Sequence, residues 1–533
     1  MGIPSYFSYI VKNHPDIIKK LIKDDLLVDN FFLDCNSIIY DIVHNLKTEE
    51  IDEKLYHYII MQVIQKIEYY ISIIAPNNLV YIAFDGVAPV AKLEQQRERR
   101  YKSWYQGQIT KQIFKKTTID PFNTSSITPG TDFMNELNTK IKKHFENRSN
   151  IGVKKIIVSG SDEFGEGEHK LFDYIRNSET VLPESVNVIY GLDADLIMLS
   201  INHLPERPNI YLFRETPHFI QNIDNSLKPN ENYIMDIPEL TKCIVDHMSN
   251  ELTLSIEQRK NVIYDYIFIC FFLGNDFMPH FPSINIRTGG VDKMLNAYKA
   301  TIGGTNDSLT DGKTIYWKNV RKMVNWLIGL EEKHWSDEMK LRQKREKVYI
   351  PEKSPEDIFK KFENIPTYQR EVEKIIDHGK NGWQKRYYQN LFDMDSEIDD
   401  ARKKQICVNY LEGLEWTMKY YSGNCPDWRW CYKYNYPPLL EDLIHHIPYF
   451  EQTFIGKNEN KAVTPLTQLC YVLPRPALSL LPGELSYKLI TKHGDLYRTD
   501  YEFTWAFCKY FWEAHVNLPE INIEDLENFL QKI

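Results

Sequence analysis

Short apolar runs that end at an acidic residue recur along the first part of this chain. Residues 30–33 are followed by Asp34, residues 79–84 lead into Asp85, and two later runs are each followed by a pair of acids. Runs of this length are typical of buried strands, and the stretches between them have helical patterns. Strands that alternate with helices predict an α/β fold with a largely parallel central sheet.

Helical segments are expected between and after these strands. The longest apolar run carries the charged residue Asp265 and is shorter than the roughly 18 residues that a membrane span needs, so we expect a buried helix there and no membrane protein. The expected helices cover most of Met1–Lys23, the residues from Asp34 to Ile42, Ile59–Ile74, the stretch after Asp85 and Tyr264–Leu273.

Acidic pairs follow two of the expected strands. Residues at i and i+2 on the exit of a strand point to the same side of the chain. In a parallel α/β sheet these positions lie at the carboxyl ends of the strands, where ligands bind. One such pair alone would be a solvated turn, but two pairs behind strands favour a metal site. The candidate acids are Asp34, Asp85, Glu166, Glu168, Asp193, Asp195 and Asp276.

Seven carboxylates in one crevice need cations, because like charges a few ångströms apart oppose joint ionisation. Oxygen ligands favour Mg²⁺ or Mn²⁺, and two such ions about 4 Å apart suit phosphodiester hydrolysis. An aspartyl phosphatase is disfavoured because the stretch after Asp34 lacks a second Asp. No GxxxxGK[ST] motif supports nucleotide-driven chemistry.

The net charge of −10 argues against a general electrostatic nucleic-acid binder. One stretch, from Lys92 to Lys116, nevertheless carries eight Lys and Arg residues against two Glu. A basic run alone is usually a solvated helix face. Four of its residues share one face at i, i+4, i+7 and i+8 and suit a pocket for a terminal phosphate. They are Lys92, Gln96, Arg99 and Arg100.

Composition indicates the class of protein and the compartment in which it acts. At 533 residues, 43% hydrophobic and 26% charged, the chain is an ordinary globular protein. The N-terminus lacks the pattern of a signal peptide, and the eight cysteines form no CxxC pair, which predicts reduced thiols in the cytoplasm. Many Ile, Lys, Asn and Tyr residues are typical of an A/T-rich genome, such as that of a parasite or large DNA virus.

Long motifs in both halves of the chain resemble the 5′-to-3′ exoribonucleases that degrade decapped messenger RNA. The resemblance extends over most of Met1–Leu526. The motifs that carry it are MGIP (1–4), FLDCNSIIY (32–40), FDGVAPVAKLEQQRERR (84–100), GEGEHK (165–170), YGLDADLIML (190–199), FFLGNDFMPHFPS (271–283), SGNCPDWRWCYKYNYPP (422–438), QLCYVLP (468–474) and WEAHVNLPEINIEDL (512–526).

The resemblance implies roles for the candidate residues. The seven acids would bind two Mg²⁺ or Mn²⁺ ions in a PIN-like (5′-nuclease-like) core, and Lys92, Gln96, Arg99 and Arg100 would hold a 5′-monophosphate. The family stacks the first base between aromatic side chains, and the candidates are Tyr40, Trp428 and Trp430. Either Trp also suits the core, since Trp is usually largely buried. Base stacking tolerates any sequence, as a processive enzyme requires.

The chain departs from the family pattern in several places. Tyr40 stands where the family usually has His, and Val90 stands where an Arg is common. Tyr40 can stack but cannot carry a positive charge, and Val90 removes one phosphate contact. The zinc-knuckle-like insert of the nuclear branch is missing, and the chain ends near the end of the nuclease core, as expected for a short form of the family.

Three regions are expected from these matches. Residues 1–330 would form the catalytic domain, residues 331–400 a charged, partly exposed helical connector, and residues 401–533 a mainly helical segment that completes the active-site pocket. Lys and Arg of the connector could guide RNA, but a solvated linker is the simpler interpretation.

The expected activity is processive hydrolysis of single-stranded RNA with a 5′-monophosphate, in mRNA decay, by a cytoplasmic monomer. A viral member would act in the host cytoplasm or be carried in the virion. The alternatives are a structure-specific 5′ flap nuclease on DNA and a catalytically silent RNA-binding scaffold. The helix that carries Gln95–Arg100 and the Trp-rich motif favour the exoribonuclease, and the seven intact acids argue against the scaffold.

Overall fold

The computed structural model of the 533-residue chain defines most of the protein. It describes residues 5–21, 26–46, 54–115, 122–146, 152–191, 193–215, 227–228, 231–249, 253–394, 399–456, 458 and 460–532.

A largely parallel sheet forms the centre of the first half of the chain, which confirms the predicted fold class. Its strand order within the described residues is β1-β7-β6-β5-β2-β3-β4. The five strands from β6 to β4 run parallel, and β7 and β1 add an antiparallel edge. The strands are β1 (Ile18–Lys20), β2 (Asn30–Asp34), β3 (Leu79–Ala83), β4 (Lys155–Ser159), β5 (Asn187–Tyr190), β6 (Ile210–Glu215) and β7 (Asn232–Asp236).

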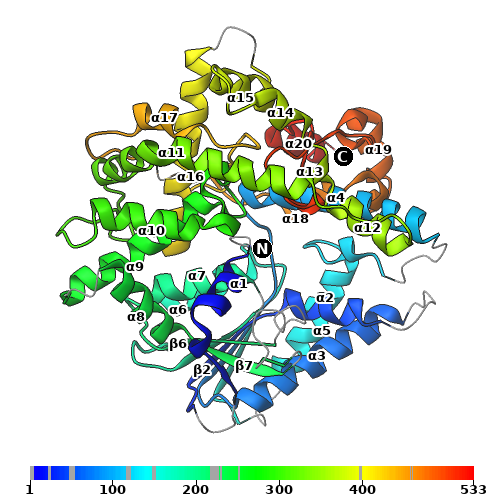
Figure 1. The fold of residues 1–533 in the computed structure, drawn as a ribbon. Coiled ribbons are helices and arrows are strands. Elements are labelled where there is room, and N and C mark those ends of the chain that lie inside the picture. The colour runs from blue at the N-terminus through cyan, green and yellow to red at the C-terminus, as the bar shows by residue number, and fades with distance from the viewer. Residues whose placement is uncertain are drawn as a thin grey trace.

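Both faces of the sheet are covered, which explains why its central strands are apolar throughout. Phe31 and Leu33 pack into the core cluster on one face, and Phe32, between them, packs into the cluster on the other. Figure 1 shows the two helical layers. The helices on the first face are α2 (Asn36–His44), α3 (Leu55–Ile74) and α5 (Asp132–Glu146), and those on the second are α6 (Gly167–Asn177), α7 (Ala194–His203), α8 (Ile237–Met248) and α9 (Ile256–Cys270).

The N-terminal segment departs from the expected single helix. Helix α1 (Tyr6–Asn13) ends just before Pro15, because the residue that precedes a proline avoids helical backbone angles. The chain then adds the edge strand β1. Residues 1–4, which make up the MGIP motif, lie outside the described residues.

A helical half covers the upper part of the molecule in Figure 1, as predicted for the C-terminal segment. No helix among the described residues is long and apolar enough to cross a membrane. The helices are α4 (Val90–Phe114), α10 (Gly290–Thr301), α11 (Trp317–Glu346), α12 (Pro355–Glu363), α13 (Ile365–Tyr368), α14 (Glu371–Ile376), α15 (Trp383–Leu391), α16 (Asp400–Ser422), α17 (Leu440–Leu443), α18 (Pro465–Val472), α19 (Leu485–His493) and α20 (Ile523–Leu530), and a short hairpin pairs β8 (Phe503–Thr504) with β9 (His515–Val516).

Helix α11 runs unbroken across residue 330, so the first expected domain boundary falls inside a helix. Its continuity follows from a stripe of buried residues that spans that point, including Leu327 and Trp335. The described part of the expected connector is largely exposed or partly exposed, but it also carries a buried polar network. Arg342 donates to both carboxylate oxygens of Glu373, at 2.9 and 2.6 Å, and Phe507 N–H donates to Glu373 Oε1 at 2.8 Å.

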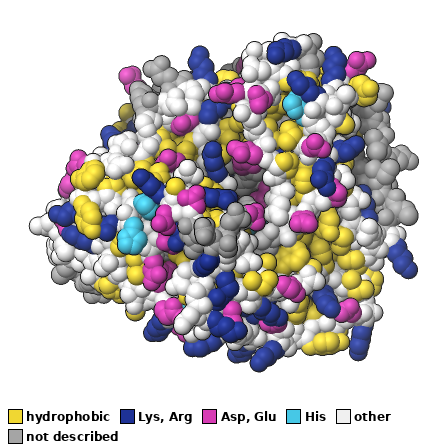
Figure 2. Space-filling view, turned by 90° about the horizontal axis from the view of Figure 1, so that it is seen from above, with side chains coloured by type: hydrophobic (Ala, Val, Ile, Leu, Met, Phe, Trp, Pro, Cys, Tyr) yellow, Lys and Arg dark blue, Asp and Glu magenta, His cyan; other side chains and the backbone are white. Residues whose placement is uncertain are grey.

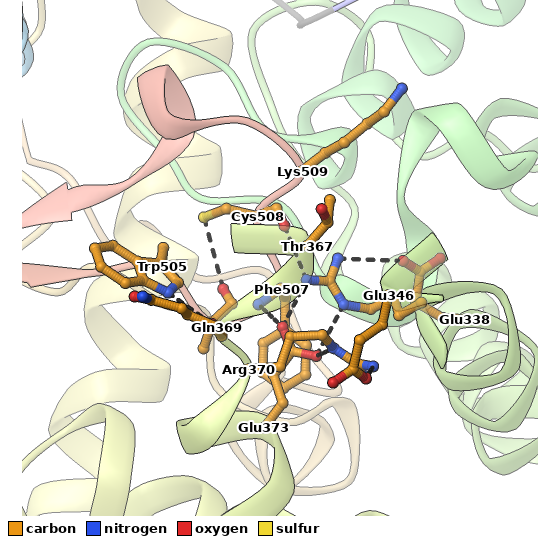
Figure 3. A network of polar contacts seen from close by, with 12 residues as sticks. Glu338, Glu346, Thr367, Gln369, Arg370, Glu373, Trp505, Phe507, Cys508 and Lys509 are labelled. Atoms are coloured by element: carbon orange, nitrogen blue, oxygen red, sulfur yellow. Dashed lines mark hydrogen bonds and ion pairs between the residues drawn. The ribbon is translucent and has the colours of Figure 1, made fainter. Parts of the chain in front are cut away.

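Figure 3 shows how this network joins distant segments: Glu373 and Arg370, at the start of α14, lie against Phe507 and Cys508. The Arg370 side chain donates to Glu373 at 2.7 Å, and Arg342 donates to the Cys508 carbonyl at 2.8 Å. The connector region is therefore attached to the C-terminal segment through paired buried charges.

Candidate active site

The seven predicted acids meet at the carboxyl edge of the sheet. Each acid lies at or just after the end of a strand or helix, so the local patterns of the sequence bring them to one edge. The repulsion that the acids exert on one another links them into one cluster. Asp34 ends β2, Asp85 follows β3, Glu166 and Glu168 begin α6, Asp193 and Asp195 begin α7, and Asp276 follows the 3₁₀ turn Phe271–Leu273.

A glycine sets the close approach of α6 to the first two acids. Gly167 N–H donates to Asp85 Oδ1 at 2.7 Å, and Asn36 Nδ2 donates to Asp85 Oδ2 at 2.5 Å. A Cβ atom at position 167 would lie 2.5 Å from Asp34 Oδ1, which is closer than any real contact. The GEGEHK motif therefore needs glycine at this position for a packing reason.

Burial and mutual repulsion make this cluster unfavourable as a set of bare carboxylates. Burial, followed by the charges of Asp85 and Asp193, raises the pKa of Asp34 well above its usual range. Burial and Asp195 do the same for the pKa of Glu168. Burial and Asp276 raise the pKa of Asp195 to about 6.

The residues present fit divalent cations. Asp34 Oδ1 is buried without a hydrogen-bond partner, so it is an oxygen ligand in need of a positive charge. Glu166, Glu168 and His169 each offer a ligand atom within 4.8 Å of the others. Burial lowers the pKa of His169 well below its usual range, which keeps its imidazole neutral, as a metal ligand must be.

Lys92, predicted to hold phosphate, lies in direct contact with the acids. Its ammonium group is 2.6 Å from Glu166 Oε2 and 2.7 Å from Asp276 Oδ2. Burial alone would lower the pKa of Lys92, but Asp276 and Glu166 raise it well above its usual range. Burial would raise the pKa of Asp276, but Lys92 lowers it. Lys92 therefore joins the basic helix to the acidic cluster.

The other basic-helix candidates extend along the same face of α4. Gln96 is buried, and its side-chain oxygen has no hydrogen-bond partner. Arg99 is half-buried and acts electrostatically on Asp276. Arg100 donates to the Ser125 carbonyl at 3.4 Å, but its Nε is buried without a partner. Polar groups with unused hydrogen-bonding capacity thus lie next to the acids.

The structure separates the two candidate tryptophans. Trp430 is 9% exposed, stacks on Trp416 at 5.2 Å between ring centroids, and donates to Glu412 Oε2 at 3.2 Å. It is therefore a core residue. Trp428 is half-exposed, and its carbonyl accepts a hydrogen bond at 3.0 Å from the N–H of Val90, the first residue of α4. Tyr40, half-buried in α2, acts electrostatically on Arg100.

Helix α16 supplies two site residues that the sequence analysis missed. Tyr420 O–H donates to Glu166 Oε1 at 3.0 Å, and Tyr421 O–H donates to Asp195 Oδ1 at 2.9 Å. The Tyr420 ring also stacks on His169, with 3.6 Å between centroids. The available signal was their position directly before the motif 422–438.

Charge is mixed over the face of the molecule that Figure 2 shows. Figure 2 shows acidic and basic side chains interspersed across one face, with acidic side chains at the edge of a central hollow. On this face the net charge of −10 is therefore not gathered into one acidic patch. A carboxylate edge of this kind, with basic groups in contact with it, is typical of metal-dependent nucleases, because cations make the acids compatible with a phosphodiester.

Comparison with known proteins identifies the family. The model described as XRN 5′-3′ exonuclease N-terminus matches residues 1–216, and the model described as Xrn1 helical domain matches residues 257–371 and 351–533. The chain belongs to the XRN family of 5′-3′ exonucleases and is a 5′-to-3′ exoribonuclease.

Curated relatives match the whole length of the chain at low identity. The 5′-3′ exoribonuclease 2 of Gallus gallus is 26% identical over 674 residues, which cover 100% of this chain and 70% of the relative. The 5′-3′ exoribonuclease 1 of Saccharomyces cerevisiae is 25% identical, with 100% of this chain and 43% of the relative covered. The human 5′-3′ exoribonuclease 1 is 26% identical, with 98% and 33% covered.

Proposed function

We propose that this exoribonuclease processively hydrolyses single-stranded, 5′-monophosphorylated RNA to nucleoside 5′-monophosphates in RNA decay. The observation that carries the proposal is the position of Lys92, which contacts Glu166 and Asp276 from the first turn of the basic helix. This contact joins the proposed phosphate-binding helix directly to the acidic cluster. Such an arrangement suits an enzyme that measures one residue from a 5′ end.

The seven acids would hold two divalent cations, Mg²⁺ or Mn²⁺. When bound, these ions would neutralise the carboxylates, polarise the phosphate and lower the pKa of a water molecule. Tyr420 and Tyr421 would keep Glu166 and Asp195 in place through their hydrogen bonds. The backbone N–H of Gly167 would do the same for Asp85.

The 5′-phosphate would lie on α4 between Gln96, Arg99 and Arg100. The buried, unpartnered Nε of Arg100 supports this proposal, because a phosphate would supply its missing acceptor. Lys92 would stand between this phosphate and the acids as a shared positive charge. A pocket closed by these side chains would exclude a cap or a triphosphate.

Tyr40 and Trp428 would stack on the first base. Trp428 is favoured over Trp430 because its ring is half-exposed and its backbone is tied to the start of α4, close to Lys92. A stacking contact contributes roughly 1–3 kcal/mol per base without selecting a sequence. Stacking of this kind supports processive action on any RNA. The eight cysteines are free, consistent with action in the cytoplasm.

The test compares one unstructured RNA with a 5′-monophosphate, a 5′-hydroxyl or a 5′-triphosphate, in the presence of Mg²⁺. We expect mononucleotides to be released from the monophosphate form, with at least tenfold slower release from the other two, because only the monophosphate both fills and fits the pocket.

The double variant Asp193→Ala/Asp195→Ala is the control and should abolish release from every form. Equal rates on the monophosphate and triphosphate would contradict the end selectivity. A preference for branched DNA would favour the flap nuclease instead. Binding of RNA and of Mg²⁺ without any turnover would favour the scaffold.

A further inference from the structure

Arg214 is a buried cation near the carboxyl end of β6 that the proposed chemistry does not use. Its side chain is 7% exposed, and its guanidinium carbon lies 3.8 Å from the centroid of the Phe7 ring. Phe7 belongs to α1, which Figure 1 shows near β6 and β7, and it packs against a small buried cluster that includes Tyr233 of β7. This cation–π contact holds the guanidinium group against the Phe7 ring.

Arg214 lacks the partners that buried arginines normally have. It forms no ion pair with any described residue, and its Nε is buried without a hydrogen-bond acceptor. Burial lowers the pKa of Arg214 to about 10, with the charges of Asp193 and Tyr190 opposing the shift. Buried charges are usually paired, because an unpaired one loses its hydration without compensation.

The contrast with Arg342 shows that this protein otherwise follows that rule. Arg342 is 4% exposed, and it donates to both oxygens of Glu373 and to the Cys508 carbonyl. The fold thus gives the Arg342 guanidinium several hydrogen-bond acceptors but leaves the Nε of Arg214 without one. The two arginines differ in environment. Arg214 lies on β6, next to β5, and interacts electrostatically with Asp193, which follows β5.

The strand order places Arg214 on the far side of the acids from the 5′-phosphate pocket. Lys92 of α4 contacts Glu166, which follows the edge strand β4. From β4 the sheet continues through β3, β2 and β5, which lead to or carry Asp85, Asp34 and Asp193, before it reaches β6. Neighbouring strands are about 4.8 Å apart, so β6 lies roughly 14 Å from β3. An RNA with its 5′ end on α4 and its scissile bond over the acids would continue toward β6.

We propose that Arg214 binds a backbone phosphate of the RNA on the 3′ side of the scissile bond. This inference rests on the proposed function, because it takes the direction of the strand from the 5′-phosphate pocket. The phosphate supplies the acceptor that Nε lacks, and Phe7 holds the guanidinium group in place for that contact. A phosphate contact positions the strand without reading its bases.

The experiment measures kcat/KM on two 5′-phosphorylated RNAs, a dinucleotide and a decanucleotide, at several KCl concentrations. The dinucleotide has no phosphate beyond its scissile one, so Arg214 has nothing to bind there. For Arg214→Gln we expect the ratio of kcat/KM on the decamer to that on the dinucleotide to fall about tenfold. The slope of log kcat/KM against log salt on the decamer should weaken by about 0.7.

Two further variants and a control separate binding from folding. Arg214→Lys should keep the wild-type slope of log kcat/KM against log salt, because it keeps the positive charge. It should lower the decamer-to-dinucleotide ratio of kcat/KM only in part, because it loses the planar guanidinium group. Phe7→Leu should lower the ratio by a smaller factor, since it only loosens the contact with the guanidinium group. If Arg214→Gln fails to fold, these two variants decide the question by themselves. Arg259→Gln, on the exposed surface of α9, should change neither quantity.

The outcomes distinguish the possible failures. An equal loss on both RNAs with an unchanged salt slope would overturn the inference and leave Arg214 as a structural counter-charge to Asp193. Failure of the wild-type protein to cleave either RNA would overturn the proposed function instead.

Discussion

Single atoms at the carboxyl edge decide whether the acids can share one site. Gly167 is the clearest case, because its missing side chain leaves the space that Asp34 and Asp85 occupy. Three of its neighbours in sequence, Gly165, Glu166 and Glu168, give the same motif its turn and its ligands. The GEGEHK motif thus provides both the space that the acids need and two of the acids themselves.

Gly167→Ala should abolish RNA hydrolysis while the protein stays folded. The new Cβ would meet Asp34 Oδ1 at 2.5 Å and force the acid out of position. We expect activity to fall at least a hundredfold, since misplacement by about 1 Å at a catalytic site has that effect. Activity on 5′-phosphorylated RNA and thermal unfolding are the measurements.

The matched control is Gly107→Ala, in α4, where a Cβ meets nothing within 4 Å. This change should keep activity and stabilise the protein by about 0.5–1 kcal/mol, because Ala favours a helix over Gly. Full activity of Gly167→Ala would show that the acids tolerate a shift and that the proposed geometry is wrong.

At the scale of elements, α16 reaches the catalytic edge from a segment more than two hundred residues away. Its Tyr420 and Tyr421 hydrogen-bond to Glu166 and Asp195, and the Tyr410 hydroxyl of the same helix donates to the carbonyl of Pro279. The helix thus touches three separate parts of the acidic edge. Its contribution is positional, since we assign the tyrosines no step in the chemistry.

Tyr420→Phe should lower kcat with little change in KM. The variant removes the hydrogen bond to Glu166 and keeps the ring that stacks on His169. We expect roughly a tenfold loss, the effect of one hydrogen bond to a charged group. Steady-state kinetics at saturating Mg²⁺ is the measurement.

Tyr387→Phe controls for the loss of a buried hydroxyl as such, because that hydroxyl donates to the Pro437 carbonyl away from the acids. Its kcat should match the wild type. An equal loss in both variants would mean that α16 acts only through general stability.

At the scale of the molecule, buried charges hold the helical half together. The network shown in Figure 3 joins α11, α14 and the segment around Cys508, which also share a buried apolar cluster. Loss of Glu373 would leave Arg342 with the Cys508 carbonyl and Arg370 with Glu346, so each buried guanidinium would lose part of its acceptors. The three-part division predicted from the sequence stays a proposal, but the middle part is fastened to its neighbour.

Glu373→Ala should destabilise the folded protein by about 3–5 kcal/mol, the usual cost of removing one partner of a buried ion pair. The measurement is thermal or urea unfolding, with a lower transition expected. Asp307→Ala, which breaks the exposed pair with Lys322, should change stability by less than about 1 kcal/mol. Similar small effects from both variants would show that the network contributes little.

Much of the fold followed from local pattern. The buried strands β2, β3 and β5 and the basic helix α4 could be predicted because a run of apolar residues, or a basic helix face, is a property of neighbours in sequence. The seven acids could be predicted to converge because parallel strands end at one edge. The edge strand β1 could not, because its pairing with β7 depends on residues more than two hundred positions away.

The sequence by itself determined the α/β class, the seven acids and the membership of the exoribonuclease family. Only the tertiary structure decided that Trp430 is a core residue, that Lys92 bridges two acids, that Tyr420 supports the site and that Arg214 lacks a partner. These facts depend on distances between residues far apart in the chain. The periodicity and spacing of residues in the sequence specify which face of a helix or strand is buried and which edge of the sheet the acids occupy. Contacts between residues far apart in the chain are set by how the helices and strands pack.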